Sequence, residues 1–347
     1  MKKSVSQFIA GILMGILISV SGFALYVKHG KSGVNAGQGE QTVIKLAHNL
    51  DSKHPVNIAL EKMKDRLDEL SGGKMTLDIH GGGVLGGTSD CIEQLQSGVL
   101  DISTSSAAFM EAFVPELGVF SLPYIFFDNN HYWKVLNSEL GKKLLQSGEN
   151  KKLRGLCYFD AGSRSFYTKD KAINVPADLK SLKVRVMGSK IAMDMVKALG
   201  GAPTPISFGE LYTALQQGVV DAAENNPPSF YTNKHHNVCK RLSMDEHTRV
   251  PDMLLISTLT WNKLSSQQQK WLQQAADEAS AYQRKLWDEK TKDALKKVQE
   301  EGVIVNYPDK KPFMEKVKPM LKSYDGTKIG KILKEIEAMH TEDKKAK

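Results

Sequence analysis

The sequence predicts an α/β protein made of two similar lobes. Strand-like and helix-like segments alternate along the 347 residues, which is typical of sheets with parallel strand pairs. A short motif also occurs twice, as LQSGVLD at 95–101 and as LQQGVVD at 215–221. Each copy has the pattern of a helix end, a glycine cap and a strand, followed by polar residues. Two related units far apart in the chain indicate two similar lobes, each with its own core, and not a single larger core.

The first lobe begins with an alternating series of strands and helices. We expect strands at 42–47, 75–80 and 99–102, and helices at 55–70 and 89–97. The first helix is amphipathic, with Pro55 in its first turn and Gly72 as its C-terminal cap. Ligands of open α/β sheets bind beyond the carboxyl ends of the strands, so two such edges that face each other would form a cleft.

The second lobe is expected to repeat this order within residues 182–226, which end in a polar Glu-Asn-Asn cluster. An apolar, strand-like segment follows at 253–259. Residues 265–299 are a long run of helix formers without Gly or Pro, and we expect one helix that bridges both lobes. The hinge is expected near 160–164 and 247–252. We expect lobe I to comprise residues 42–162 plus 250–288, and lobe II to comprise residues 163–249 plus 289–347.

The N-terminus has the pattern of an export signal. Lys2 and Lys3 precede an apolar run over residues 8–27, and small residues around Ala24 favour cleavage after it. The run is also nearly long enough to span a bilayer, so a retained N-terminal anchor is the alternative. We expect residues 1–27 to be this signal peptide or anchor, and the polar, Gly-rich residues 28–41 to be a disordered tether. In both cases the folded part would be periplasmic or otherwise extracytoplasmic.

Composition and motifs argue against several classes of function. The net charge is +8 at pH 7, but no basic cluster is interleaved with aromatic residues, so we expect no nucleic-acid partner. Cys91, Cys157 and Cys239 are far apart and predict no disulfide framework, and His235-His236 near Cys239 lacks a second ligand pair for zinc. The sequence contains no GxSxG, HExxH or phosphate loop. We therefore expect no enzyme, no metal site and no cofactor.

Arg185 is the most informative single residue, because it stands in an otherwise apolar strand. A charge inside a strand is costly unless it is paired. The planar guanidinium matches a carboxylate with two parallel hydrogen bonds, so the missing partner could arrive as a ligand. The alternative is a structural ion pair with an acidic side chain of the same lobe.

Residues 182–225, LKVRVMGSKIAMDMVKALGGAPTPISFGELYTALQQGVVDAAEN, resemble the signature of the solute-binding proteins of TRAP (tripartite ATP-independent periplasmic) transporters, the DctP family. The similarity covers essentially all of residues 42–325. It implies a two-lobed periplasmic-binding-protein-like (Venus flytrap) fold with a long helix across both lobes. It also implies that Arg185 holds the carboxylate of the substrate.

The end of this signature departs from the family motif VDGQENP. Ala222 and Ala223 replace Gly and Gln, and Asn226 stands before the proline. Asn225 still falls on the ligand-binding asparagine of the family, so the resemblance implies a ligand contact for Asn225.

The resemblance also implies roles for Arg164 and Phe208. Arg164 lies among aromatic residues in YFDAGSRSFYT, where the family has a second arginine that contacts an acidic ligand. The alternative is a surface arginine stacked on Tyr167. Phe208 stands at a helix start, where an aromatic side chain packs against the ligand in relatives; helical spacing alone would make it a core residue.

Four further residues complete the candidate ligand-binding set. Glu246, before the proposed hinge, would accept hydrogen bonds from sugar hydroxyls or would otherwise be a lone exposed acid. His48 and His54 lie in a loop that leaves a strand end and faces the cleft, although most lone histidines are structural. Asp90 begins a helix and could be only a cap or dipole partner. The resemblance implies that an acid near Asp90 reaches the ligand in sugar-acid binders.

The segments YFDAGSRSFYT and SSAAFMEAFVPELGVFSLPYIF look most like the uronate-binding members of the family. We expect a monomer that captures a hexuronate such as glucuronate or galacturonate and delivers it, chemically unchanged, to integral-membrane TRAP subunits. The alternatives are a binder of C4-dicarboxylates or other organic acids, a membrane-anchored sensory module, and a secreted lyase or isomerase of sugar acids with His54 as its base.

Overall fold

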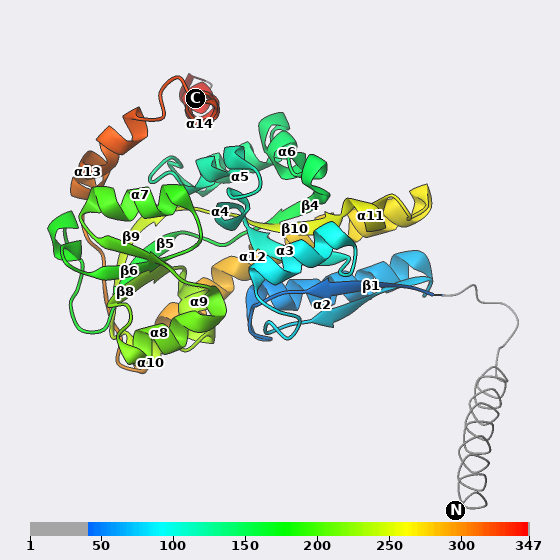
Figure 1. Cartoon of the computed structure of the whole chain (residues 1–347), viewed down its shortest axis with the longest axis horizontal. Coiled ribbons are helices and arrows are strands. Elements are labelled where there is room, and N and C mark those ends of the chain that lie inside the picture. Colours follow the sequence, from blue (N-terminus) through cyan, green and yellow to red (C-terminus); the bar gives the residue numbers. More distant parts are fainter. Residues whose placement is uncertain (1–40, 346–347) are drawn as a thin grey trace, which may run out of the picture. The chain divides into compact units, whose positions relative to one another are not determined.

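The computed structural model describes residues 41–345, and the chain from Thr42 onward forms one compact unit. Two β-sheets organise this unit (Figure 1). The expected signal peptide or anchor at 1–27 and nearly all of the expected tether at 28–41 lie outside the described residues. Within the described part, no helix is both long enough and apolar enough to cross a membrane.

The first sheet has five strands in the order β2-β1-β3-β10-β4. They are β1 (Thr42–Ala47), β2 (Met75–His80), β3 (Ile102–Ser106), β4 (Leu153–Phe159) and β10 (Asp252–Ser257). β1 is parallel to β2 and β3, whereas β10 is antiparallel to β3 and β4. The strand expected at 99–102 begins only at Ile102. The reason is that Gly98 caps the preceding helix in a left-handed conformation and leaves Val99 66% exposed.

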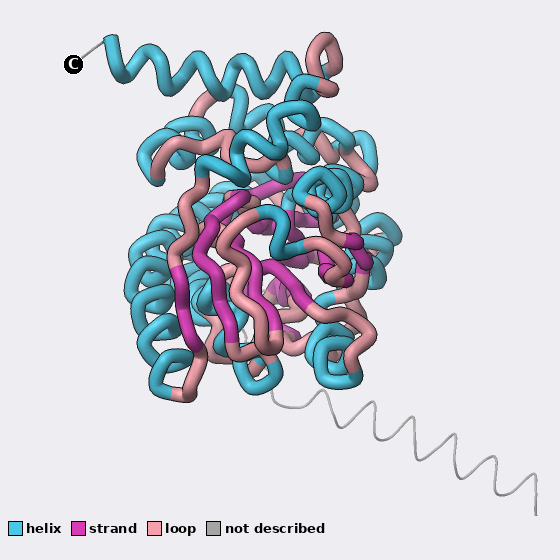
Figure 2. The backbone as a smooth tube through the Cα atoms, turned by 90° about the vertical axis from the view of Figure 1, so that its left-hand side faces the viewer, coloured by secondary structure: helices cyan, strands magenta, loops and turns pink. Residues whose placement is uncertain are grey.

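The second sheet has six strands in the order β11-β9-β5-β8-β6-β7. They are β5 (Arg164–Thr168), β6 (Lys183–Val186), β7 (Ala202–Pro205), β8 (Ala222–Asn225), β9 (Arg241–Thr248) and β11 (Ile304–Asn306). β6 is parallel to β7 and β8, and β5 is antiparallel to β8 and β9. Figure 2 shows strands lying side by side with helices around them.

The two copies of the repeated motif occupy equivalent places in the two sheets. Both sheets contain a β-α-β-α-β series, with α2 (Pro55–Ser71) and α3 (Thr88–Ser97) in the first and α7 (Lys190–Leu199) and α8 (Leu211–Gln217) in the second. Asp101 Oδ2 accepts a hydrogen bond from the backbone N–H of Lys45, and Asp221 Oδ2 accepts one from Lys183, each at 2.8 Å. The motif therefore marks two structurally similar lobes, as expected.

The long helix expected at 265–299 is α12 (Ser266–Glu300), 35 residues long. Ser265 and Gln268 begin it with a capping box. α12 contacts α2 and β4 beside the first sheet and also α9 (Pro227–Thr232) beside the second. Leu272 belongs to the apolar core under the first sheet and Val298 to a core under the second. One helix therefore connects both lobes (Figure 1), as expected.

Shorter helices and two C-terminal helices complete the described part of the chain. They are α4 (Ala107–Met110), η1 (Pro115–Ser121), α5 (Asn129–Asn137), α6 (Glu139–Gln146), η2 (Glu149–Lys151), η3 (Pro176–Leu179), η4 (Phe208–Glu210), α10 (His235–Val238), α11 (Thr258–Trp261), α13 (Lys311–Lys322) and α14 (Lys328–Lys345). The expected lobe II included residues 289–347, and therefore α14, but α14 packs on elements of lobe I. Its Leu333 and Ile336 instead join the core of α5 and η1, because those elements offer the matching apolar surface.

Candidate functional site

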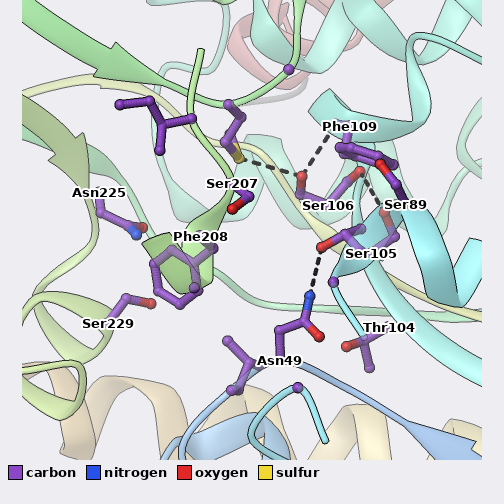
Figure 3. Close-up of a pocket in the computed structure, with 18 of the residues that line it drawn as sticks. Asn49, Ser89, Thr104, Ser105, Ser106, Phe109, Ser207, Phe208, Asn225 and Ser229 are labelled. Atoms are coloured by element: carbon purple, nitrogen blue, oxygen red, sulfur yellow. Dashed lines mark hydrogen bonds between the residues drawn. The ribbon is translucent and has the colours of Figure 1, made fainter. Parts of the chain in front are cut away.

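A cavity of about 700 Å³ lies between the two sheets, where the carboxyl ends of their parallel strands face each other. Its wall includes residues at or just beyond six strand ends: Asn49, Gly82 and Ser106 from β1, β2 and β3, and Met187, Pro205 and Asn225 from β6, β7 and β8. In Figure 3, Asn49, Ser89 and Ser105 lie across the cavity from Phe208, Asn225 and Ser229. Two equivalent sheet edges thus form one ligand-sized site.

Arg185 lines this cavity from the middle of β6 and is 2% exposed. Its Nε donates a hydrogen bond to the carbonyl of Ile206 at 2.9 Å, but its buried Nη1 has no hydrogen-bond partner. Desolvation lowers the pKa of Arg185 to about 10, and the nearby Arg164 charge adds to the effect. Arg185 is therefore a buried cation with unused donors, and a carboxylate ligand would satisfy them.

Arg164 also lines the cavity but is held by protein groups. Its Nε and Nη2 donate to the two carboxylate oxygens of Glu224 at 2.5 and 2.9 Å, and Nη1 donates to Asn225 Oδ1 at 2.8 Å. Arg164 is 5% exposed, so the alternative of a surface arginine stacked on Tyr167 is wrong. The structural ion pair considered for Arg185 is instead formed by Arg164.

A buried charge network continues behind Arg164. Glu224 Oε2 lies 3.4 Å from His247 Nε2, and His247 Nδ1 lies 2.8 Å from Asp245 Oδ2. Burial would lower the pKa of His247, but the Asp245 and Glu224 carboxylates outweigh it and raise the pKa to about 9. Burial would raise the pKa of Glu224, yet Arg164 and His247 hold it at about 2. The network thus consists of alternating charges that fix Arg164 at the cavity wall.

Asn225 and Phe208 both lie on the cavity wall, in the positions predicted for ligand contacts. The Asn225 amide oxygen accepts hydrogen bonds from Arg164 and from the backbone N–H of Asn226 at 2.9 Å. Its Nδ2 is then the group left for a ligand. Phe208 is half-buried on η4, where it lines the cavity and also packs against the core of the second lobe, with its ring centroid 5.9 Å from the Arg185 guanidinium carbon.

Three carboxylates line the cavity: Asp90, Glu210 and Asp252. Asp90 Oδ2 accepts a hydrogen bond from the N–H of Gly87 at 2.7 Å. Asp90 therefore caps the helix α3 and also lines the cavity. Glu210 Oε2 accepts from the hydroxyl of Ser207 at 2.6 Å. Burial raises the pKa of Asp252 to about 6, against the attraction of Arg164.

Three of the predicted ligand residues lie outside the cavity wall. His48 Nε2 lies 2.8 Å from Asn57 Oδ1, and its Nδ1 accepts the N–H of Leu50. His54 caps α2 and lies one side chain behind the wall, with Nε2 3.2 Å from Ser229 Oγ. Burial lowers the pKa of His54 to about 3, so it is neutral.

Glu246 is the third of these residues, and its side chain forms an ion pair with Lys310 instead of entering the cavity. Its backbone φ of 49° is in the left-handed region, at a kink near the end of β9. The cavity wall gives no support to the ligand contact predicted for Glu246, which stays a prediction. Its neighbour Asp245 points inward, to His247.

The sequence analysis did not single out several cavity residues: Asn49, Ser105, Ser106, Ser229 and Asp252. A signal for some of them was present. The polar stretch Ser103–Ser106 follows the first copy of the repeated motif, just as Asn225 and Asn226 follow the second. Applied to both copies, the rule that strand ends carry the site would have found the serines.

Comparisons with known proteins identify a family. The model of the family described as bacterial extracellular solute-binding protein, family 7 (DctP), matches residues 46–327. A solute-binding protein of Chromohalobacter salexigens is 34% identical over 268 residues, which cover 77% of this chain and 80% of that protein.

Two solved structures are also similar over most of their length. A TRAP periplasmic solute-binding protein from Anaerococcus prevotii with bound α/β-D-glucuronate has a TM-score of 0.84 at 34% identity and covers 87% of this chain and 99% of its own. One from Bradyrhizobium with bound α/β-D-galacturonate has a TM-score of 0.82 at 36% identity and covers 85% and 99%.

Proposed function

The chain belongs to family 7 of the bacterial extracellular solute-binding proteins (DctP), and we propose that it captures a hexuronate such as glucuronate or galacturonate. The observation that carries this proposal is the unpartnered Nη1 of Arg185 at the wall of a polar cavity. A buried guanidinium without a protein partner is costly, and the carboxylate of a ligand would remove that cost.

The other groups on the wall support a sugar acid over a simpler acid. Hydroxyls and amides from both sheets surround the cavity, among them Asn49, Ser105 and Asn225. Carboxylates also line it, and they accept hydrogen bonds but repel a second acid. Of the two arginines on the wall, only Arg185 lacks an acidic partner, and one such cation with many hydroxyl-binding groups fits a polyhydroxylated monocarboxylate. Similar proteins with bound glucuronate and galacturonate support the same substrate class.

The mechanism we propose is capture followed by delivery. The ligand would bind between the lobes, favour their closed arrangement, and be released to integral-membrane TRAP subunits. Arg185 would hold the carboxylate, Phe208 would pack against one face of the ligand, and Asn225 would fix its orientation. No bond of the ligand is broken. Residues 1–27 would direct export, with retention as an anchor as the alternative.

A thermal-shift screen tests the proposal. The folded unit from Thr42 onward is heated with hexuronates, aldonates, C4-dicarboxylates and amino acids. A ligand at about 100 times its dissociation constant should add about 2.7 kcal/mol to the free energy of unfolding. We expect a shift with a hexuronate that Arg185→Met abolishes and that the control Arg66→Met, at a surface ion pair, retains. A shift with dicarboxylates alone would contradict the proposed substrate.

A further inference from the structure

We infer that Asp252 contacts the ligand through a hydroxyl group and selects polyhydroxylated monocarboxylates against dicarboxylates. The inference rests on the proposed function and adds a specificity determinant opposite in charge to Arg185. It starts from the position of Asp252 at the first residue of β10, where the chain enters the first sheet from the second. There Asp252 pairs with Ser106 on β3 and Phe159 on β4, at the sheet edge that borders the cavity.

Asp252 differs from the other two acids of the wall. Asp90 accepts a hydrogen bond from Gly87, and Glu210 accepts one from Ser207, so each has a local structural role. Within residues 41–345, the Asp252 carboxylate accepts no hydrogen bond from a protein donor. Unlike the buried Nη1 of Arg185, the Asp252 carboxylate keeps solvent access at the cavity wall, so a ligand hydroxyl can replace water there.

Arg164 does not serve as the missing partner of Asp252. Its charge lowers the pKa of Asp252, but its N–H groups are directed to Glu224 and Asn225. The charge of Asp160 raises the pKa of Asp252. Burial has the largest effect, so the pKa of Asp252 is raised to about 6, although the residue is only half-buried at the cavity wall. A carboxylate with a raised pKa in a cavity is a candidate binding group.

The chemistry of the carboxylate defines what Asp252 would select. An ionised carboxylate is an acceptor only, so it binds hydroxyl donors well through short, charge-assisted hydrogen bonds. It repels a second carboxylate at the same place. Arg185 would therefore bind the acid end of the ligand, while Asp252 would bind a hydroxyl and exclude a dicarboxylate of similar length.

The experiment compares the wild type with Asp252→Asn by calorimetric titration with glucuronate, galacturonate and succinate. We expect affinity for the wild type's hexuronate to fall at least about tenfold, since a charge-assisted hydrogen bond is lost. We also expect the preference for that hexuronate over succinate to shrink by about tenfold or more. Asp65→Asn is the matched control, because Asp65 is exposed on α2 and does not line the cavity; its selectivity should stay close to that of the wild type.

The melting temperature of the ligand-free protein supplies an independent measurement. Removing a half-buried charge that accepts no hydrogen bond from a protein donor should leave the melting temperature of Asp252→Asn equal to that of the wild type or higher. A marked decrease, or loss of the fold, would identify Asp252 as a structural partner of Arg164 and overturn the inference. Unchanged hexuronate affinity and selectivity would overturn it as well. If the wild type itself bound no hexuronate, the proposed function would fail before this inference is reached.

Discussion

Arg185 and Arg164 are two buried arginines of the same cavity that differ in their hydrogen-bond and charge partners. Arg164 has Glu224 and Asn225 as fixed partners, whereas Arg185 keeps only a backbone carbonyl. An ion pair that loses one partner leaves an uncompensated buried charge, which is strongly destabilising. The two residues should therefore respond to substitution in opposite ways.

We predict that Arg164→Met lowers the free energy of unfolding by about 3–5 kcal/mol, because the buried Glu224 loses its two-pronged partner and keeps only His247, at 3.4 Å. Arg185→Met should leave this free energy equal or higher, and should weaken hexuronate binding by about 100-fold or more through two lost charge-assisted hydrogen bonds. Urea unfolding of the ligand-free proteins measures the first effect and calorimetric titration the second. Equal destabilisation by both substitutions would contradict the assignment of Arg185 to the ligand.

The His247 network predicts how stability depends on pH. His247 has a folded-state pKa of about 9, raised above its ordinary value of 6.5, so its stabilisation is complete below pH 6.5 and is lost as the pH rises through 9. Glu224 has a pKa lowered from 4.5 to about 2, so its stabilisation is present above pH 4.5 and is lost as the pH falls through 2. Both contributions are complete between pH 4.5 and 6.5.

We therefore expect the free energy of unfolding to fall by up to about 3 kcal/mol between pH 6.5 and 10 because of His247. Urea unfolding across this range measures the decrease, and His247→Gln should show a clearly smaller one. A variant with the same pH slope as the wild type would show that His247 does not titrate in this network.

At the scale of elements, the start of α7 is fixed by a side chain from the other lobe. Glu111, at the C-terminal end of α4, accepts hydrogen bonds from the Ser189 hydroxyl at 2.5 Å and from the N–H of Ile191 at 3.4 Å. α4 follows β3 of the first sheet, and α7 follows β6 of the second. A carboxylate at a helix N-terminus also interacts favourably with the helix dipole. Glu111 thus links the lobes beside the cavity.

We predict that Glu111→Gln weakens hexuronate binding about two- to fivefold, although Glu111 is not on the cavity wall. The reason is that the lobe arrangement that holds the ligand loses a stabilising contact. Titration calorimetry measures the change, with the exposed Glu61→Gln on α2 as the control. An unchanged affinity would indicate that this contact is equally stable with and without ligand.

The elements also show what the sequence could and could not predict. The repeated motif located two equivalent helix-to-strand junctions, because glycine caps and period changes are local signals. The predicted start of the first of these strands, at residue 99, is too early. Asp101 accepts a hydrogen bond from the backbone N–H of Lys45 on β1, and the regular pairing of β3 begins only at Ile102. That contact joins residues far apart in sequence and leaves no local pattern.

The same distinction holds for the cavity. Arg185 was identifiable because a charge in an apolar strand is a local anomaly. The partner of Arg164 was not, because Glu224 reaches it only through the antiparallel pairing of β5 with β8. Asp252 was missed since its significance depends on the cavity it faces. His48 and His54 were placed in the correct loop, but their rings are turned to Asn57 and Ser229.

At the scale of the whole molecule, two lobes of similar construction are joined by chain crossings and by α12. The crossings lie near residues 160–163 and 249–251, between β4 and β5 and between β9 and β10. The hinge predicted near 160–164 and 247–252 stays a prediction. α12 packs in the cores of both lobes, and α14 adds a contact on α5 and η1 that the sequence did not predict. Binding at the interface of two lobes lets a small ligand influence the arrangement of the entire molecule.

The most direct test of the account is a crystal structure of the protein with the hexuronate that gives the largest thermal shift. The account predicts the ligand carboxylate about 2.7–2.9 Å from Nη1 of Arg185, with the sugar ring against Phe208. A ligand whose carboxylate lies away from Arg185, with Nη1 still unpartnered, would contradict the central claim that this arginine is kept for the substrate.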